Sequence, residues 1–127
     1  MNKWEALEMV LNNYHGKVPD EFWSDEEFVL HACHWNGFNF RFANSSLKKN
    51  KKFVSKIIKY WGYSFEFADN NLKKDKDFIL EAVTFNASIF KYVDPALRND
   101  KNFTSEVLKK CHLTSEYIDN NLRKAFN

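Results

Sequence analysis

Histidine and cysteine side chains that could bind a metal stand together at His31, Cys33 and His34. Imidazole and thiolate groups are ordinary zinc ligands, but a structural zinc site needs four ligands that converge on one point. On a helix, His31 and His34 share a face at a spacing of three residues, whereas Cys33 points away from that face. The chain also lacks a glycine-rich phosphate loop and a serine in a nucleophile elbow. We therefore expect no metal, no other cofactor and no enzymatic activity.

Lysine clusters recur along the chain and could bind an anion. One stretch runs from Leu47 to Phe53, and related stretches run from Leu72 to Phe78 and from Leu97 to Phe103. A lysine in the first turn of a helix opposes the helix dipole by about 0.3–1 kcal/mol, and a recurrent breach of such a preference is typical of functional sites. Exposed turns also carry lysines without any function. The candidate anion-binding residues are Lys48, Lys49, Lys51, Lys52, Lys73, Lys74 and Lys76.

These clusters belong to a 25-residue repeat, whose period separates Phe28, Phe53, Phe78 and Phe103. The same step separates Leu47, Leu72, Leu97 and Leu122. Each unit predicts a helix of about 11 residues. The short polar residues that cap these helices are Asp25, Asn50, Asp75 and Asp100. In this register Cys33 aligns with Ile58, Val83 and Leu108, so we expect it in the core.

Other positions predict where the helices of each unit begin and end. Gly37 and Gly62 are placed as C-terminal glycines of the long helices. A second, shorter helix is expected to begin after Asn39, Ser64 and Thr114, which are good cap residues. Ahead of the repeats, Trp4, Leu7, Leu11 and Tyr14 predict the apolar side of one further helix, joined by Val10.

The fold class follows from this repeat, because so short a unit cannot bury its apolar faces alone and must stack on its neighbours. We predict an all-α protein, a short α-solenoid of about four 25-residue helix–turn–short-helix repeats with an N-terminal capping helix. The chain is expected to be a single repeat-built domain, 1–127. Its parts are the cap and half-repeat 1–23 and the repeats 24–48, 49–73, 74–98 and 99–124.

The stretch from Leu72 to Asn86, Leu-Lys-Lys-Asp-Lys-Asp-Phe-Ile-Leu-Glu-Ala-Val-Thr-Phe-Asn, resembles the repeat of the domain of unknown function 4116 family. The resemblance extends over residues from about 20 to 124. It implies tandem α-helical repeats, and it implies neither a catalytic motif nor a cofactor.

Aromatic residues form a second recurrent feature and are the candidate partner-binding residues: Trp35, Phe38, Tyr60, Trp61, Tyr63 and Phe85. They could pack under the short helix, or they could line a groove of the solenoid and anchor a partner, as Trp and Tyr do at interface hot spots. The leading expectation is a protein–protein interaction module with an unknown protein partner. The alternative is binding of a polyanion or nucleic-acid backbone through the lysines.

The remaining expectations concern location and assembly. The longest apolar run falls short of the ~18–20 residues of a membrane span, and the start of the chain does not resemble a signal peptide. We expect a cytoplasmic protein, or one exported without a cleavable signal peptide, with no membrane partner. Since the sequence stops just after the fourth repeat, the C-terminal repeat is a candidate homodimer surface.

Overall fold

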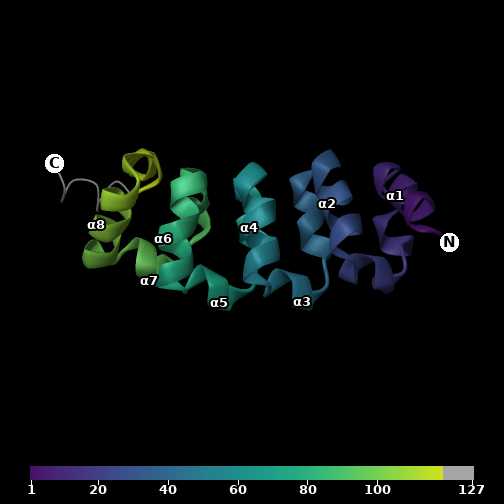
Figure 1. The fold of residues 1–127 in the computed structure, drawn as a ribbon, viewed down its shortest axis with the longest axis horizontal. Coiled ribbons are helices and arrows are strands. Elements are labelled where there is room, and N and C mark those ends of the chain that lie inside the picture. The colour runs from purple at the N-terminus through teal and green to yellow at the C-terminus, as the bar shows by residue number, and fades with distance from the viewer. Residues whose placement is uncertain (119–127) are drawn as a thin grey trace.

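Five α-helices stand side by side in one row in the computed structural model, which describes residues 1–118 (Figure 1). They are α1 (Lys3–Leu11), α2 (Glu26–Trp35), α4 (Lys51–Tyr60), α6 (Lys76–Phe85) and α8 (Lys101–Lys110). The residues described contain no β-strand. The last four of these helices begin at equivalent positions of successive sequence repeats, so the repeat of the sequence is a repeat of the structure. The molecule is an all-α repeat solenoid, as the sequence predicted.

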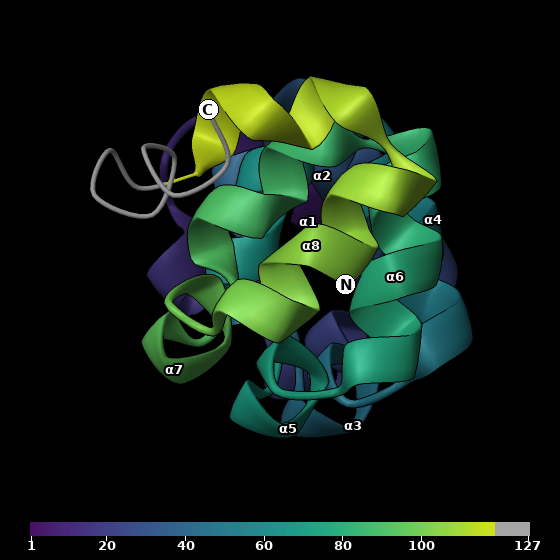
Figure 2. The ribbon, with the colours of Figure 1, turned by 90° about the vertical axis from the view of Figure 1, so that its left-hand side faces the viewer.

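Each of the last four long helices is followed by a 3₁₀ helix, and after α2, α4 and α6 one turn of α-helix then leads to the next unit. The 3₁₀ helices are η3 (Gly37–Phe42), η4 (Gly62–Phe67), η5 (Ala87–Tyr92) and η6 (His112–Tyr117). The one-turn helices are α3 (Ser45–Lys48), α5 (Asn70–Lys73) and α7 (Pro95–Arg98). At the N-terminal end, η1 (His15–Lys17) and η2 (Asp20–Ser24) lie between α1 and α2. Seen along the row, α3, α5 and α7 gather along one edge of the array (Figure 2).

The side chains predicted to cap the long helices do so. The carboxylate of Asp25 accepts a hydrogen bond from the backbone N–H of Phe28 at 2.9 Å. Asn50, Asp75 and Asp100 accept the equivalent bonds at 3.0 Å from Phe53, Phe78 and Phe103. Each bond satisfies one of the free amides of a first helical turn.

The predicted short second helix is present after each of the last four long helices, but it is a 3₁₀ helix and begins earlier than expected. A 3₁₀ helix begins there at Gly37, Gly62 and His112, two residues before the expected caps Asn39, Ser64 and Thr114. In the first repeat, Asn36 is the cap, since its side chain accepts from the N–H of Phe38 at 3.0 Å. The side chain of Asn39 instead donates to the carbonyl of Ala32 at 2.9 Å, so it closes the end of α2.

Gly37 and Gly62 do not adopt the left-handed conformation that is usual for a glycine after a helix. Among residues 1–118, no glycine has a positive φ. Both positions need glycine because a neighbouring repeat leaves no room for a side chain there. A Cβ added at Gly37 would lie 2.6 Å from the hydroxyl oxygen of Tyr63, and one at Gly62 would lie 2.2 Å from the Oγ of Ser88. Each glycine lets the next repeat approach its backbone, and Ser64 uses this approach to donate to the carbonyl of Gly37 at 2.7 Å.

The core runs along the whole row and is built by phenylalanines from adjoining repeats. The side chains of Phe28, Phe53, Phe78 and Phe103 are buried, as are those of Phe40, Phe65 and Phe90 in the 3₁₀ helices. The ring of Phe40 lies 6.3 Å from that of Phe53 in the next repeat, and Phe65 lies 5.9 Å from Phe78. Cys33 is fully buried in this core, as predicted. Leu122 lies outside the residues described.

Backbone hydrogen bonds join neighbouring repeats at one recurring place. The N–H of Asn44 donates to the carbonyl of Trp23 at 2.8 Å. The same bond recurs one repeat later from Asp69 to Lys48, and again from Asp94 to Lys73, each at 3.0 Å. The carbonyl of Trp23 therefore stands where those of Lys48 and Lys73 stand in the later repeats.

We expect Phe53→Ala to lower the free energy of unfolding by about 3–5 kcal/mol, because it removes a fully buried ring and leaves a cavity. Urea denaturation followed by circular dichroism measures this. Phe38→Ala is the matched control, since 44% of the Phe38 side chain is exposed and its removal should cost less than half as much. Equal losses for the two variants would contradict the assigned core.

The glycine contacts predict that Gly62→Ala destabilises the fold by about 1–3 kcal/mol through overpacking against the next repeat. Removing the nearest obstructing atom in Gly62→Ala/Ser88→Ala should recover part of this loss. Gly16→Ala is the control, because a Cβ there meets no atom within 4 Å and the substitution should be neutral or stabilising by up to about 1 kcal/mol. Thermal or urea unfolding distinguishes the three proteins.

Candidate interaction surface

Two large aromatic side chains project from the long helices into solvent. Trp35 stands at the end of α2 with 62% of its surface exposed, and Tyr60 stands at the equivalent position of α4 with 70% exposed. They project because Phe28, Ala32 and their equivalents take the inner face of each helix. These two side chains therefore do not pack under the 3₁₀ helices, and they are available to a partner.

A groove of about 500 Å³ lies between α2 and α4. Tyr60 and Trp61 line its α4 side, with ring centres 5.8 Å apart. His34 lies on the α2 side, and its ring meets Trp61 edge to face at 6.4 Å. The other lining residues are Glu27, Leu30, His31 and Lys56. The groove therefore combines aromatic surface with both signs of charge.

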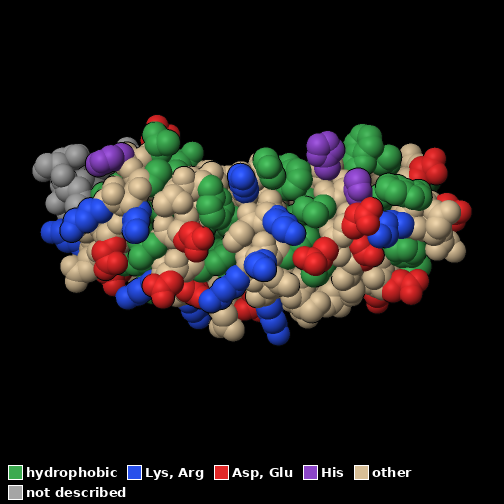
Figure 3. Space-filling model, in the orientation of Figure 1, with side chains coloured by type: hydrophobic (Ala, Val, Ile, Leu, Met, Phe, Trp, Pro, Cys, Tyr) green, Lys and Arg blue, Asp and Glu red, His purple; other side chains and the backbone are tan. Residues whose placement is uncertain are grey.

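A second groove, of about 370 Å³, lies on the opposite side of α2, against α1. Its lining is Trp4, Leu7, Glu8, Leu11, His31 and Trp35. Trp4 is 60% exposed, and its ring meets His31 edge to face at 5.5 Å. The two grooves lie on opposite sides of α2, and His31 lines both of them. They therefore form one continuous surface that crosses α2. Figure 3 shows apolar and histidine side chains gathered over this N-terminal part of the array.

Sequence reasoning missed Trp4 as a surface residue, because it placed Trp4 on the apolar side of α1; of that predicted side, Leu7 and Val10 are buried and the rest is exposed. Trp4, Leu11 and Tyr14 are exposed, whereas Ala6, Leu7 and Val10 are buried. The signal that could have found this is the pattern of the other long helices, in which the buried positions are i, i+1 and i+4. Ala6, Leu7 and Val10 fit that pattern, and Trp4 then falls outside it.

The other predicted aromatic residues are placed elsewhere. Phe38 and Tyr63 pack together on the 3₁₀ helices with ring centres 4.7 Å apart, and Phe38 also meets Phe67 at 5.9 Å. The hydroxyl of Tyr63 accepts from the N–H of Gly37 at 3.0 Å, which makes Tyr63 part of the repeat junction. Phe85 is half-buried against the core. The six predicted residues therefore do not form one continuous groove.

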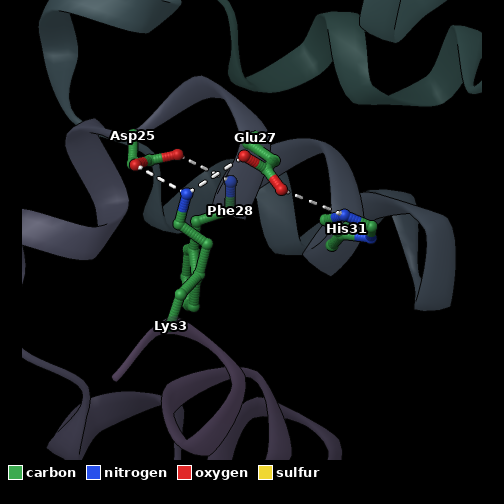
Figure 4. Close-up of polar contacts among 5 residues, drawn as sticks. All are labelled: Lys3, Asp25, Glu27, Phe28 and His31. Atoms are coloured by element: carbon green, nitrogen blue, oxygen red, sulfur yellow. Dashed lines mark hydrogen bonds and ion pairs between the residues drawn. The ribbon is translucent and has the colours of Figure 1, made fainter. Parts of the chain in front are cut away.

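A network of charged groups fixes the start of α2 beside α1 (Figure 4). The ammonium of Lys3 lies 3.1 Å from Asp25 and 3.2 Å from Glu27. The backbone N–H of Phe28, followed by Lys3, holds the pKa of Asp25 below its usual value. Glu27 also faces the imidazole of His31 at 3.9 Å. One side of His31 is thereby fixed at the junction of the two grooves.

Three of the seven candidate anion-binding lysines already have partners in the chain. The ammonium of Lys48 donates to the carbonyl of Arg41 at 2.6 Å, and that of Lys73 donates to the carbonyl of Glu66. Burial lowers the pKa of both lysines. Lys51 forms an ion pair with Asp75 at 2.8 Å. The remaining four are exposed, namely Lys49, Lys52, Lys74 and Lys76.

The lysine at the start of α4 therefore has a structural role that the sequence did not predict. Lys51 pairs with the residue that caps the next long helix, Asp75. Lys3 does the same for Asp25 one helix earlier. A cation that opposes the dipole of its own helix here stabilises the cap of its neighbour. At Lys51 the breach of the helix preference is therefore explained by the junction between repeats, without any ligand.

The cysteine of the His31, Cys33 and His34 stretch is separated from the two histidines. Cys33 is fully buried, and this burial raises the pKa of its thiol to about 12, whereas both histidines are exposed. Within residues 1–118, no group of three His, Cys, Asp or Glu side chains is arranged to hold a metal ion. In the same part of the chain, no helix has the length and apolar character needed to cross a membrane.

The predicted homodimer surface at the C-terminal repeat is described only in part. Leu113 in η6 is 67% exposed, so this repeat does carry an apolar side chain on its surface. The rest of the repeat beyond Ile118 lies outside the residues described. Self-association through it stays a prediction.

The Lys51–Asp75 pair predicts a dependence of stability on pH. The hydrogen bond from Lys51, followed by that from the N–H of Phe78, lowers the pKa of Asp75. A carboxyl group with a lowered folded pKa stabilises the fold above its unfolded value of about 3.9, and this contribution is lost as the pH falls through the folded pKa. Asp75→Asn keeps a cap of the kind that Asn50 provides, but it removes the charge.

We therefore expect Asp75→Asn to be less stable than the wild type at pH 7, with the difference shrinking as the pH falls below about 4. Urea unfolding at a series of pH values measures it. In a Lys51→Met background the same substitution should have a smaller effect at pH 7. A difference that stays constant down to pH 2.5, which is about one and a half units below the ordinary carboxyl value, would contradict this account.

The architecture described above agrees with the comparison to known families. Four overlapping stretches, residues 6–48, 25–74, 50–98 and 75–123, match one family. Successive matches begin near the starts of successive long helices, and the first includes most of α1, so the N-terminal segment counts as a repeat of the family. No curated protein and no solved structure matches the chain significantly. Since the matches together cover nearly its whole length, the chain belongs to the family described as Domain of unknown function (DUF4116).

Proposed function

We propose that the protein is a non-enzymatic module that binds another protein through the surface formed by the two grooves beside α2. The observation that carries this proposal is the exposure of Trp4, Trp35 and Tyr60 around these grooves. Single exposed apolar residues are common on protein surfaces, but large aromatic side chains gathered around adjoining grooves are typical of interaction sites.

The composition of the surface also supports a protein partner. Tryptophan and tyrosine contribute most to interface hot spots, because they bury a large area at a small cost in side-chain entropy. Trp61 is half-buried and packs against Tyr60 and His34. It therefore forms part of the base of the α2–α4 groove. Helical repeat arrays use extended surfaces of this kind to bind their partners.

Polyanion binding through the lysines has less support. The ammonium groups of Lys48, Lys51 and Lys73 are held by the chain itself, and an anion would have to displace those contacts. The exposed lysines are also interrupted by the carboxylates of Asp75 and Asp77 at the start of α6. We therefore place the binding surface on the aromatic side chains.

The test is a quantitative affinity capture from cells that make the protein, with the tagged wild type and three variants as baits. We expect Trp35→Ala and Tyr60→Ala to lose the same captured protein by at least about tenfold, as hot-spot truncations do. Tyr14→Ala is the matched control, because Tyr14 is 56% exposed and lines neither groove. Circular dichroism confirms that all baits are folded.

Recovery of the same proteins by wild type and both groove variants would reject the proposal. A titration with duplex and single-stranded nucleic acid at two salt concentrations tests the other class of partner. Nucleic-acid binding could be tight and strongly salt-dependent, persist in Trp35→Ala and disappear in Lys49→Glu/Lys52→Glu. That result would show that the lysines are the binding site.

A further inference from the structure

We propose that the α1–α2 groove binds a basic segment of the partner protein, with an arginine or lysine side chain stacked on Trp4 or Trp35 and paired with Glu8. This inference rests on the proposed function and adds the chemistry of the partner to it. It is carried by the lining of the groove, by the charge around it and by the cation–π contacts found elsewhere in the chain.

The lining of this groove suits a cation. Trp4 and Trp35 are both about three-fifths exposed, at 60% and 62%. Trp4 meets His31 from α1, and Trp35 follows His31 by one turn of α2, so both indoles line the groove beside His31. Glu8 lies one turn after Trp4 on α1 and supplies a carboxylate within the same groove. A cation within about 6 Å of an indole face is attracted by the ring, most strongly when the ring is tryptophan.

The charge around the groove favours the same occupant. The lining contains Glu8 and no lysine or arginine. The nearby cation Lys3 is already paired with Asp25 and Glu27, and Glu27 also faces His31. The stretch 1–27 carries only two lysines, Lys3 and Lys17, against the acidic residues Glu5, Glu8, Asp20, Glu21, Asp25, Glu26 and Glu27. Figure 3 shows acidic side chains concentrated toward this end of the array. Such a surface attracts basic segments.

Several other aromatic rings, the exposed Tyr14 and Tyr60 among them, already receive a cation from the chain. Lys59 lies 5.7 Å from the ring centre of Tyr60, and Lys91 lies 5.8 Å from that of Tyr92. Lys17 and Arg41 cover Tyr14 and Phe42 at 5.7 and 4.5 Å. In the described part of the chain, Trp4 and Trp35 have no such cation. The position before Trp35 is His34, where the next repeat has Lys59 before Tyr60. The partner would supply the kind of cation that the chain itself provides at the exposed rings of Tyr14 and Tyr60.

The α2–α4 groove does not share this character, although it also contains Trp61. Lys56 lines it, and Lys59 stands over Tyr60 at its edge. A basic side chain entering there would meet like charge from α4. We therefore assign the basic segment to the α1–α2 groove and leave the α2–α4 groove to apolar side chains of the same partner.

The experiment uses nuclear magnetic resonance of the full-length protein, in which the indole N–H signals of Trp4, Trp23, Trp35 and Trp61 report separately on the two grooves and the core. The probe is the blocked peptide acetyl-Gly-Ser-Arg-Ser-Gly-amide at millimolar concentration. Two matched peptides carry citrulline or glutamate in place of arginine. Citrulline has nearly the same shape as arginine but no charge. Assignment uses the four single Trp→Phe variants.

We expect the arginine peptide to shift the signals of Trp4 and Trp35 and to leave that of the buried Trp23 unchanged. The citrulline peptide should bind at least about fivefold more weakly, because it lacks the cation. Glu8→Gln should weaken binding of the arginine peptide about threefold, as expected of one partly exposed ion pair. Glu106→Gln, which removes an exposed carboxylate from α8, is the control and should change nothing.

Equal binding of the citrulline peptide, a preference for the glutamate peptide, shifts confined to Trp61, or no shift at all would each overturn the inference. These outcomes leave the proposed function open to its own test. A protein captured through Trp35 and Tyr60 that contains no basic segment at its contact site would uphold the proposed function and reject this inference. If both groove variants capture the same proteins as the wild type and the arginine peptide causes no shift, the proposed function and this inference are both rejected.

Discussion

The structure depends on a phenylalanine in one repeat packing against a phenylalanine in the next. A 3₁₀ helix of six residues has poor hydrogen-bond geometry, and an isolated α-helix of ten residues is marginal in water, so neither element is stable alone. Phe40 of η3 and Phe53 of α4 bury one another across a repeat boundary, and Phe65 and Phe78 repeat the contact. At the equivalent position of η6 the chain has Ser115. The aromatic part of the core is therefore built between repeats, and each unit is folded by its neighbours.

The features predictable from sequence are those that recur at the same step. The caps Asp25, Asn50, Asp75 and Asp100 and the buried phenylalanines were identified because four copies carry the same physical requirement at one position. The type of the second helix was not predictable in this way. The four 3₁₀ helices begin at Gly37, Gly62, Ala87 and His112, so no single residue type specifies them. What the junction does decide is the glycine at position 37, because Tyr63 and Ser64 approach it so closely that no Cβ fits. A glycine near a helix end has two physical explanations, and only the packing shows which one applies.

The surface was predictable only in part, for a related reason. The register placed Trp35 and Tyr60 outside the main core face, but it could not tell a groove from a second layer of packing. It gave no help with α1, which lacks the copies needed to fix its inner positions, so the predicted core side joined the exposed Trp4 to the buried Leu7 and Val10. The role of Lys51 was hidden because its partner, Asp75, lies in the next repeat. A local rule applied to one helix cannot reveal a contact made by two.

The position of His31 on the outer face has a consequence for how such an array can change. The same place in the next three long helices holds Lys56, Glu81 and Glu106, and the place of Trp35 holds Tyr60, Phe85 and Lys110. The inner positions of these helices keep nearly the same apolar character throughout. The positions that build the core and those that form the outer surface are thus separate within a common 25-residue repeat. Substitutions at the outer positions of one repeat can therefore change the charge or the aromatic residue of one groove. The neighbouring grooves and the scaffold are not altered by such substitutions.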